Sequence, residues 1–157
     1  TATTTQGGEP VGTLTVAAAP LQVIDIPLEL VPLAIDEFPA IFIAAACASG
    51  ATVLRGAEER RVKESDRIAV MAEGLRALGA DIEPLADGIR IQGGNLHAGH
   101  VQARGDHRIA MSFAIAGLVA SGPIHIDGCA EVDTSFPGFV ELAGKAGLSI
   151  TARDQSV

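Results

Sequence analysis

Apolar residues recur with helical spacing just after a charged segment in the first half of the chain. They follow one another at intervals of three, four and three, at Ile68, Met71, Leu75 and Leu78. This spacing places them on one face of a helix. Ser65 is suited to cap the start of that helix, and Gly79 to end it. The pattern therefore predicts a helix between Ser65 and Gly79.

Two other stretches are apolar on every side. The first, IFIAAACA at 41–48, follows Asp36, Glu37 and Pro39 and ends before a Ser-Gly pair. The second, IAMSFAIAGLVA at 109–120, follows GDHR at 105–108 and also ends before Ser-Gly. Helices without a polar face lie inside a protein, so both are predicted to be buried helices. A further helix is expected in PGFVELAGKAG at 137–147, with a polar start at 133–135.

Short β-branched segments lie between these helices. Strands are predicted in ATVLRG at 51–56, on both sides of the Ala-Asp-Gly turn at 86–88, in PIHIDG at 123–128 and in LSI at 148–150. Residues 9–35 are apolar but interrupted by Pro20, Pro27 and Pro32. One or two short strands and an irregular connection are expected there.

An internal repeat relates the two halves of the chain. ACASGATVLRGAEE at 46–59 matches LVASGPIHIDGCAE at 118–131 with a shift of 72 residues, and GADI at 79–82 matches GLSI at 147–150. Repeats of this length indicate one structural unit used more than once. The sequence predicts a pseudo-symmetric α/β domain with buried helices and strands outside them.

The start of every predicted helix is polar, and several of these starts carry cations. If parallel helices bring their N-termini to one end, unpaired backbone N–H groups form an anion site there. Lys63, Arg67 and Arg108 would add full positive charges to it. Cations are unfavourable at the positive end of a helix dipole unless an anion is present.

A structural explanation of the same residues stays open. Ser and Asp cap helices routinely, and exposed Arg and Lys beside Asp and Glu commonly form solvated ion pairs. Asp36 is a good cap in its own right, and a histidine beside an acid, such as His107, is more often structural. Capping and solvated pairs do not explain the cations at the helix starts, which favour a ligand site.

Composition excludes several classes of function. The net charge of −8 and the lack of Trp and Tyr argue against a nucleic-acid partner. No apolar run reaches the length of a membrane span. The two cysteines, in small-residue contexts without CxxC spacing, are expected to be reduced thiols of a cytoplasmic protein. The sequence starts TATTTQGGEP, without Met, which suggests a processed or excised piece.

Known motifs for metals and nucleotides give no positive signal. His97 and His100 form HxxH without an acid or thiol at metal spacing, so no metal site is expected. The glycines form neither GxGxxG nor a Walker loop, and no GxSxG or Cys-His pattern supports an acyl-enzyme.

Four motifs in order resemble a known enzyme family. They are IDEFPAIFIAAACASGATVLRG at 35–56, RVKESDRI at 61–68 with GLRALGA at 74–80, GDHRIAMSF at 105–113 and TSFPGF at 134–139. Over residues 34–150 they resemble the C-terminal lobe of 5-enolpyruvylshikimate-3-phosphate synthases. This likeness implies an α/β (α+β) enolpyruvyl transferase-like fold of repeated βαβαββ units, in which residues 1–33 are a remnant of a preceding unit. Residues 34–104 and 105–157 would be two units of one lobe, and the N-terminal lobe would be missing.

The resemblance also implies a reaction without a metal or organic cofactor. Such enzymes transfer the enolpyruvyl group of phosphoenolpyruvate to the 5-hydroxyl of shikimate 3-phosphate. By resemblance, Asp36 contacts the shikimate hydroxyls as base or orienter, and Glu64 protonates the enol methylene carbon. Lys63 reaches phosphate or the shared oxygen. Arg67 and Arg108 likewise clamp phosphoenolpyruvate, and His107 supports the same site. The chain by itself is expected to be inactive or nearly so.

One position departs from the pattern of some members. They carry a lysine where this chain has Thr134, which leaves one phosphate contact open. Two other functions also remain: the related enolpyruvyl transferase acting on UDP-N-acetylglucosamine, and a non-catalytic repeat or interaction domain. The RVKESDR and DHR motifs together favour the shikimate enzyme.

Overall fold

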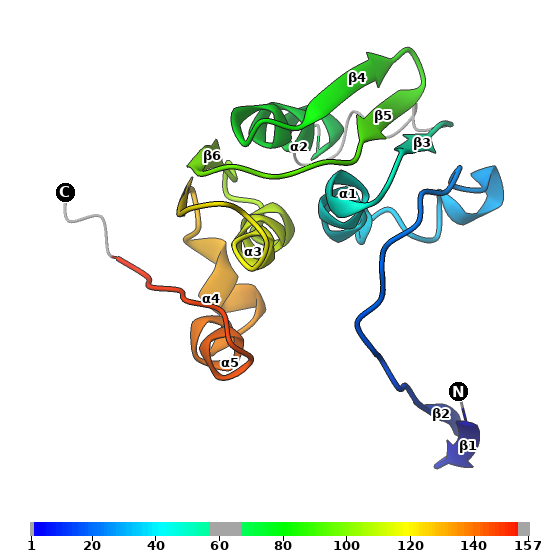
Figure 1. Ribbon diagram of the computed structural model, residues 1–157. Coiled ribbons are helices and arrows are strands. Elements are labelled where there is room, and N and C mark those ends of the chain that lie inside the picture. Colours follow the sequence, from blue (N-terminus) through cyan, green and yellow to red (C-terminus); the bar gives the residue numbers. More distant parts are fainter. Residues whose placement is uncertain (1, 57–66, 154–157) are drawn as a thin grey trace.

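A computed structural model of the chain describes residues 2–56 and 67–153. Helices α1 and α2 pack against each other under a three-stranded antiparallel sheet of order β3-β5-β4, and α3 packs on α1 (Figure 1). The described elements are β1 Ala2–Gln6, β2 Glu9–Thr13, η1 Leu28–Leu30, α1 Phe38–Cys47, β3 Ala51–Leu54, α2 Arg67–Ala77, β4 Asp81–Leu85, β5 Gly88–Gln92, β6 Gly99–Gln102, α3 His107–Ala116, β7 Ile124–Asp127, α4 Glu131–Ser135 and α5 Phe139–Lys145. The predicted mixed class, with helices inside and strands outside, is confirmed.

A parallel strand–helix–strand arrangement occurs twice. In the first, residues 22–25 run parallel to β3 through isolated bridges, and α1 connects the two. In the second, α3 connects β6 to β7, which pair in parallel. In both, the helix begins beyond the carboxyl end of the first strand. The loops that enter α1 and α3 hold Asp36 and Asp106, respectively.

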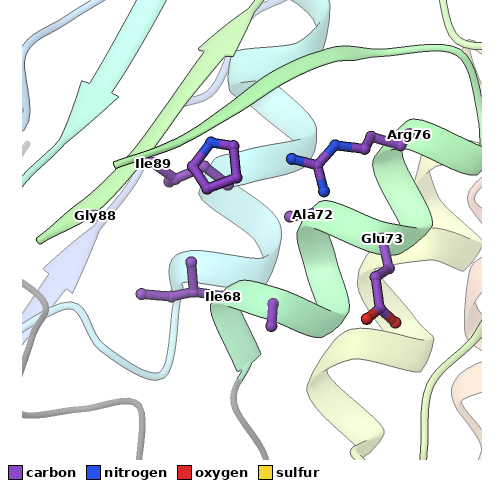
Figure 2. A pocket seen from close by; sticks show the side chains of 8 residues that line it. Ile68, Ala72, Glu73, Arg76, Gly88 and Ile89 are labelled. Carbon is purple, nitrogen blue, oxygen red and sulfur yellow. The ribbon is translucent and has the colours of Figure 1, made fainter. Parts of the chain in front are cut away.

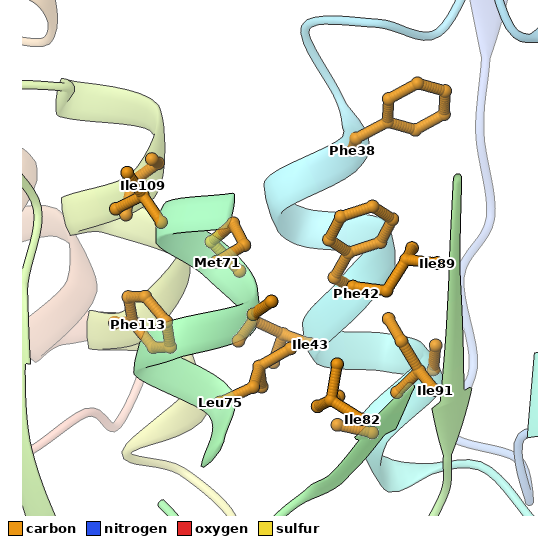
Figure 3. Packing of buried hydrophobic residues seen from close by; sticks show 14 of the residues in the cluster. Phe38, Phe42, Ile43, Met71, Leu75, Ile82, Ile89, Ile91, Ile109 and Phe113 are labelled. Atoms are coloured by element: carbon orange, nitrogen blue, oxygen red, sulfur yellow. The ribbon is translucent and has the colours of Figure 1, made fainter. Parts of the chain in front are cut away.

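The core lies where the three longer helices meet the sheet. Phe42 of α1 and Phe113 of α3 are almost fully buried, as are Met71 and Leu75 of α2 (Figure 3). Ile89 and Ile91 of β5 cover the same cluster from the sheet side. The α2 residues are two of the four whose spacing predicted a helix, so the predicted periodicity and its buried face are confirmed. This packing fixes the helices relative to one another, and with them their starts.

The contact between α2 and α3 depends on a glycine. A Cβ added at Gly74 would lie 2.3 Å from Cζ of Phe113, whereas one added at Gly144 in α5 would meet nothing within 4 Å. We expect Gly74→Ala to lower the free energy of unfolding by about 1–3 kcal/mol, because an overpacked core must shift. The control Gly144→Ala should leave it unchanged or raise it by up to about 1 kcal/mol. Urea unfolding followed by circular dichroism measures both, and equal effects would contradict the close approach.

The second apolar helix is shorter than predicted. α3 ends at Ala116, and the next residues form turns in which Leu118 and Val119 donate to Ile115 and Ala116, respectively. Leu118 and Val119 are 55% and 58% exposed. The prediction that the whole run 109–120 is a buried helix is therefore wrong at its end. Here Ser121 N donates to the carbonyl oxygen of Leu96, which directs the chain away from the helix axis.

Two further predictions near the C-terminus are wrong. Residues 133–135 end the short helix α4 instead of starting the last helix; α5 begins at Phe139, after Gly138 with φ 78°. Residues 148–150 are not a strand, because in the described part of the chain no strand pairs with them. The equivalent strand β4 is held by its hairpin partner β5.

The N-terminal segment lies apart from the core. β1 and β2 form a hairpin, and residues 3–22 are exposed (Figure 1). Strand β2 and the irregular connection that follows it agree with the prediction for residues 9–35. Within residues 2–56 and 67–153, no helix has the length and apolarity needed to cross a membrane.

Candidate active site

Asp36 connects the start of α1 to two arginines. Its Oδ1 lies 2.7 Å from Nη1 of Arg67, and its Oδ2 lies 3.5 Å from Nη2 of Arg108. The N-cap residue of α1 is Glu37, whose side chain makes no capping hydrogen bond. Asp36 comes directly before this N-cap residue, and its carboxylate contacts the two arginines. A side chain at one helix start thus contacts side chains from two others.

Arg67 lies between two carboxylates. Its Nε donates to Oδ2 of Asp106 at 2.5 Å, and its Nη1 donates to Oδ1 of Asp36 at 2.7 Å. Burial by itself lowers the pKa of Arg67, but the hydrogen bonds and negative charges of Asp106 and Asp36 outweigh it and raise the pKa above its ordinary value. The two carboxylates therefore stabilise the positively charged form of the guanidinium.

Arg108 reaches the same place from the first turn of α3. Its Nη1 donates to the backbone oxygen of Asp36 at 3.2 Å, and its side chain is 38% exposed. Asp106 caps this helix by accepting from the backbone N–H groups of Arg108 and Ile109. The predicted convergence of Asp36, Arg67 and Arg108 from separate helix starts is confirmed, while their roles stay predictions.

The structure describes only some of the other predicted site residues. Lys63 and Glu64 lie outside the described residues, as do Ser65 and Asp66. His107 is the first residue of α3 and is half-buried. Thr134, at the position where the resemblance leads us to expect a lysine in some members, lies in α4 and is exposed.

Asp106 was missed as a site residue. The sequence showed it as part of a polar helix start, but gave no reason to connect it with Arg67, 39 positions earlier. Its side chain is 6% exposed, against 49% for Asp36. The signal available was an Asp directly before a buried helix, which is also the signal of an ordinary cap. The contact with Arg67 becomes visible only when the helices are packed.

The cluster is balanced in charge and open on one side. Asp106 and Arg67 form its buried part, while Asp36 and Arg108 form its exposed part. From the sequence, the cations at the helix starts indicated a bound anion. In the structure, the carboxylates of Asp36 and Asp106 supply negative charge next to these cations. Guanidinium groups bind planar carboxylates and phosphates through paired hydrogen bonds. The arrangement is suited to holding an anionic substrate beside a carboxylate that accepts a proton.

Comparison with known proteins then decides the family. The family model described as EPSP synthase (3-phosphoshikimate 1-carboxyvinyltransferase) matches residues 2–142. The chain belongs to the EPSP synthase family. The match includes all the residues of the cluster.

Individual members of the EPSP synthase family agree with this assignment. The 3-phosphoshikimate 1-carboxyvinyltransferase of Nitrosococcus oceani is 67% identical over 144 residues, which are 92% of this chain and 32% of that protein. The one from Alkalilimnicola ehrlichii is 62% identical, over 94% of this chain and 33% of its own length. The structure of the EPSP synthase from Acinetobacter baumannii matches with a TM-score of 0.92 and 52% identity, over 97% of this chain and 36% of that one. The chain spans about a third of the length of these relatives.

The two histidines of the HxxH motif contact different side chains. In this member of the EPSP synthase family, Nδ1 of His97 lies 3.3 Å from Oγ of Ser121, whereas Nε2 of His100 lies 2.7 Å from Oδ2 of Asp127. Within the described part of the chain, no group of three or more His, Cys, Asp or Glu side chains is arranged to hold a metal ion.

A small pocket lies apart from the arginine cluster. It has a volume of about 210 Å³ and lies between α2 and the β4–β5 hairpin (Figure 2). Ala72, Glu73, Arg76 and Ile89 are among its lining residues. Neither Asp36, Arg67 nor Arg108 lines it. The pocket is therefore separate from the candidate active site of the EPSP synthase family member.

The thiol of Cys129 is expected to be a poor nucleophile. Burial and the negative charge of Asp127 raise its pKa, and its Sγ donates to the backbone oxygen of Ile126. A raised pKa leaves less thiolate at pH 8, so alkylation by iodoacetamide should be slow and should accelerate as the pH rises. Asp127→Asn should increase the rate at pH 8 roughly two- to fivefold.

Cys47 is the internal control for this measurement. Burial raises its pKa without a contribution from Asp127, so its rate should not change in Asp127→Asn. Mass spectrometry of the alkylated peptides separates the two rates. An unchanged rate at Cys129 would contradict the electrostatic explanation.

Proposed function

We propose that this chain is part of an enzyme that transfers the enolpyruvyl group of phosphoenolpyruvate to the 5-hydroxyl of shikimate 3-phosphate, a step of aromatic amino acid biosynthesis. The observation that carries the proposal is the meeting of Asp36, Arg67 and Arg108 at three helix starts. It occurs in a chain of the EPSP synthase family. Both substrates are polyanions, which suits a site that contains two guanidinium groups.

The reaction requires a base, an acid and anion-binding groups. The 5-hydroxyl oxygen adds to C2 of phosphoenolpyruvate, its proton passes to Asp36, and an acid protonates C3 to give a tetrahedral adduct. The adduct then loses a proton from C3, the bond from C2 to the phosphate oxygen breaks, and phosphate leaves. Arg67 and Arg108 hold the carboxylate of phosphoenolpyruvate through paired hydrogen bonds, which a lysine does not provide.

The charged segment before α2 supplies the other groups. Glu64 and Lys63 precede Arg67 by three and four positions. Glu64 is the proposed acid that protonates C3, and Lys63 is the proposed contact to phosphate or to the shared oxygen. His107, next to Arg108 in the sequence, supports the same site. The proposed chemistry uses neither a metal ion nor an organic cofactor.

The proposed enzyme is larger than this chain. Because the chain spans about a third of its relatives' length, we infer that an N-terminal lobe completes the site and that the chain alone has little or no activity. The described cysteines are free thiols, which fits a cytoplasmic enzyme.

A chimera tests the proposal. In it, this chain replaces the matching third of the Nitrosococcus oceani relative, and phosphate release from phosphoenolpyruvate is measured in the presence of shikimate 3-phosphate. We expect turnover within about tenfold of the intact relative. UDP-N-acetylglucosamine serves as the alternative acceptor and should give none. A folded chimera that releases no phosphate with either acceptor would favour a non-catalytic domain and would reject the proposal.

A further inference from the structure

Asp106 uses its two carboxylate oxygens for different tasks. Oδ1 accepts hydrogen bonds from the backbone nitrogens of Arg108, at 2.9 Å, and Ile109, at 3.3 Å. Oδ2 accepts from Nε of Arg67 at 2.5 Å. One oxygen therefore caps the helix that carries one arginine, and the other oxygen holds the side chain of the second arginine.

The bond to Nε determines which way Arg67 faces. A guanidinium is planar and rigid, so fixing one nitrogen and its plane leaves the others in defined directions. With Nε on Asp106, Nη1 reaches Asp36 at 2.7 Å. Arg67 Nε thus lies on the buried side of the cluster and Nη1 on the exposed side, since the side chain of Asp106 is 6% exposed and that of Asp36 is 49% exposed.

We propose that Asp106 is a positioning residue that sets both substrate-binding arginines. It orients Arg67 through its side chain and Arg108 through the start of α3, and it does not itself touch substrate. This inference rests on the proposed function. Because the arginines hold phosphoenolpyruvate before and during the reaction, a change in their position should alter KM more than kcat.

A second ion pair joins α2 to the loop between β6 and α3, which also contains Asp106, and it provides a matched control. Nη2 of Arg104 in the loop contacts Oε2 of Glu73 in α2, with both side chains more than half exposed. Exposed pairs of this kind contribute little. Glu73→Gln makes the same chemical change as Asp106→Asn, from carboxylate to amide, away from the cluster. It removes a link between the same two elements without changing a contact of Arg67.

The test uses Asp106→Asn in the chimera. Asparagine keeps an oxygen that caps α3 but removes the negative charge from Nε of Arg67. We expect the KM for phosphoenolpyruvate to rise roughly 10- to 100-fold, as for loss of a charge-assisted hydrogen bond. We expect kcat to change less than about threefold, and Glu73→Gln to match the wild type in both. An unchanged KM in a folded Asp106→Asn variant, or an equal rise in both variants, would overturn the inference.

A double-substitution cycle makes the result independent of any general loss of stability. In an Arg67→Ala background, Asp106→Asn should raise the KM no further, because asparagine keeps the cap of α3 and the Arg67 side chain, whose charged partner it removes, is gone. Effects that multiply would overturn the positioning role. A wild-type chimera without turnover would reject the proposed function and this inference with it. An active wild type with these contrary results would reject the inference alone.

Discussion

Glu64→Gln in the chimera should reduce phosphate release about 10²- to 10⁴-fold, the usual contribution of a general acid or base. Glutamine has nearly the shape of glutamate but has no acidic proton to give to C3 of phosphoenolpyruvate. Shikimate 3-phosphate should still bind, because the substitution removes no positive charge from the proposed site. Phosphate release and calorimetric binding measure the two quantities separately.

Glu73→Gln is the control for this loss as well. Glu73 lies on α2 and its side chain is 58% exposed, so the same change there should leave turnover within about twofold of the wild type. Full turnover in Glu64→Gln would show that another group donates the proton. Loss of shikimate 3-phosphate binding together with turnover would instead point to a defect in folding.

Arg67→Lys should lower kcat/KM for phosphoenolpyruvate about 100-fold. Lysine keeps the positive charge, but its single ammonium does not span Asp36 and Asp106, which Arg67 contacts with two different nitrogens. The buried carboxylate of Asp106 then loses its charged partner, so we also expect a lower midpoint of thermal unfolding. Steady-state kinetics and a thermal scan of the same variant measure both effects.

Arg104→Lys is the matched substitution. Arg104 contacts Glu73 with a side chain that is 54% exposed, and lysine is able to keep such a solvated pair. We expect kinetics and thermal midpoint close to those of the wild type. Wild-type kinetics in Arg67→Lys would mean that charge alone is sufficient and that the paired geometry has no role.

The fold was predictable where a local sequence pattern is compatible with only one type of secondary structure. The spacing of Met71 and Leu75 defined the buried face of α2, and the turn at 86–88 defined the hairpin of β4 and β5. Predictions failed where tertiary contacts decide the outcome. Leu118 and Val119 continue an apolar run, yet the hydrogen bond from Ser121 to Leu96 turns the chain there. Leu148 resembles the start of a strand, but no described strand lies beside it.

The sequence identified several residues of the site, but it did not show which of them contact one another. Cations at the starts of buried helices were the useful signal, because such positions are unfavourable without compensating charge. That signal identified Arg67 and Arg108. It did not identify what compensates them, since the contacts with Asp36 and Asp106 span 31 and 39 positions of sequence. Only the packing of α1, α2 and α3 brings those residues together.

A crystal structure of the Glu64→Gln chimera with phosphoenolpyruvate and shikimate 3-phosphate tests most directly whether the meeting helix starts form the substrate site. We predict that both carboxylate oxygens of phosphoenolpyruvate lie within about 3 Å of guanidinium nitrogens of Arg67 and Arg108, and that Asp36 faces the shikimate hydroxyls. Phosphoenolpyruvate bound elsewhere, with both arginines contacting protein groups only, would contradict it.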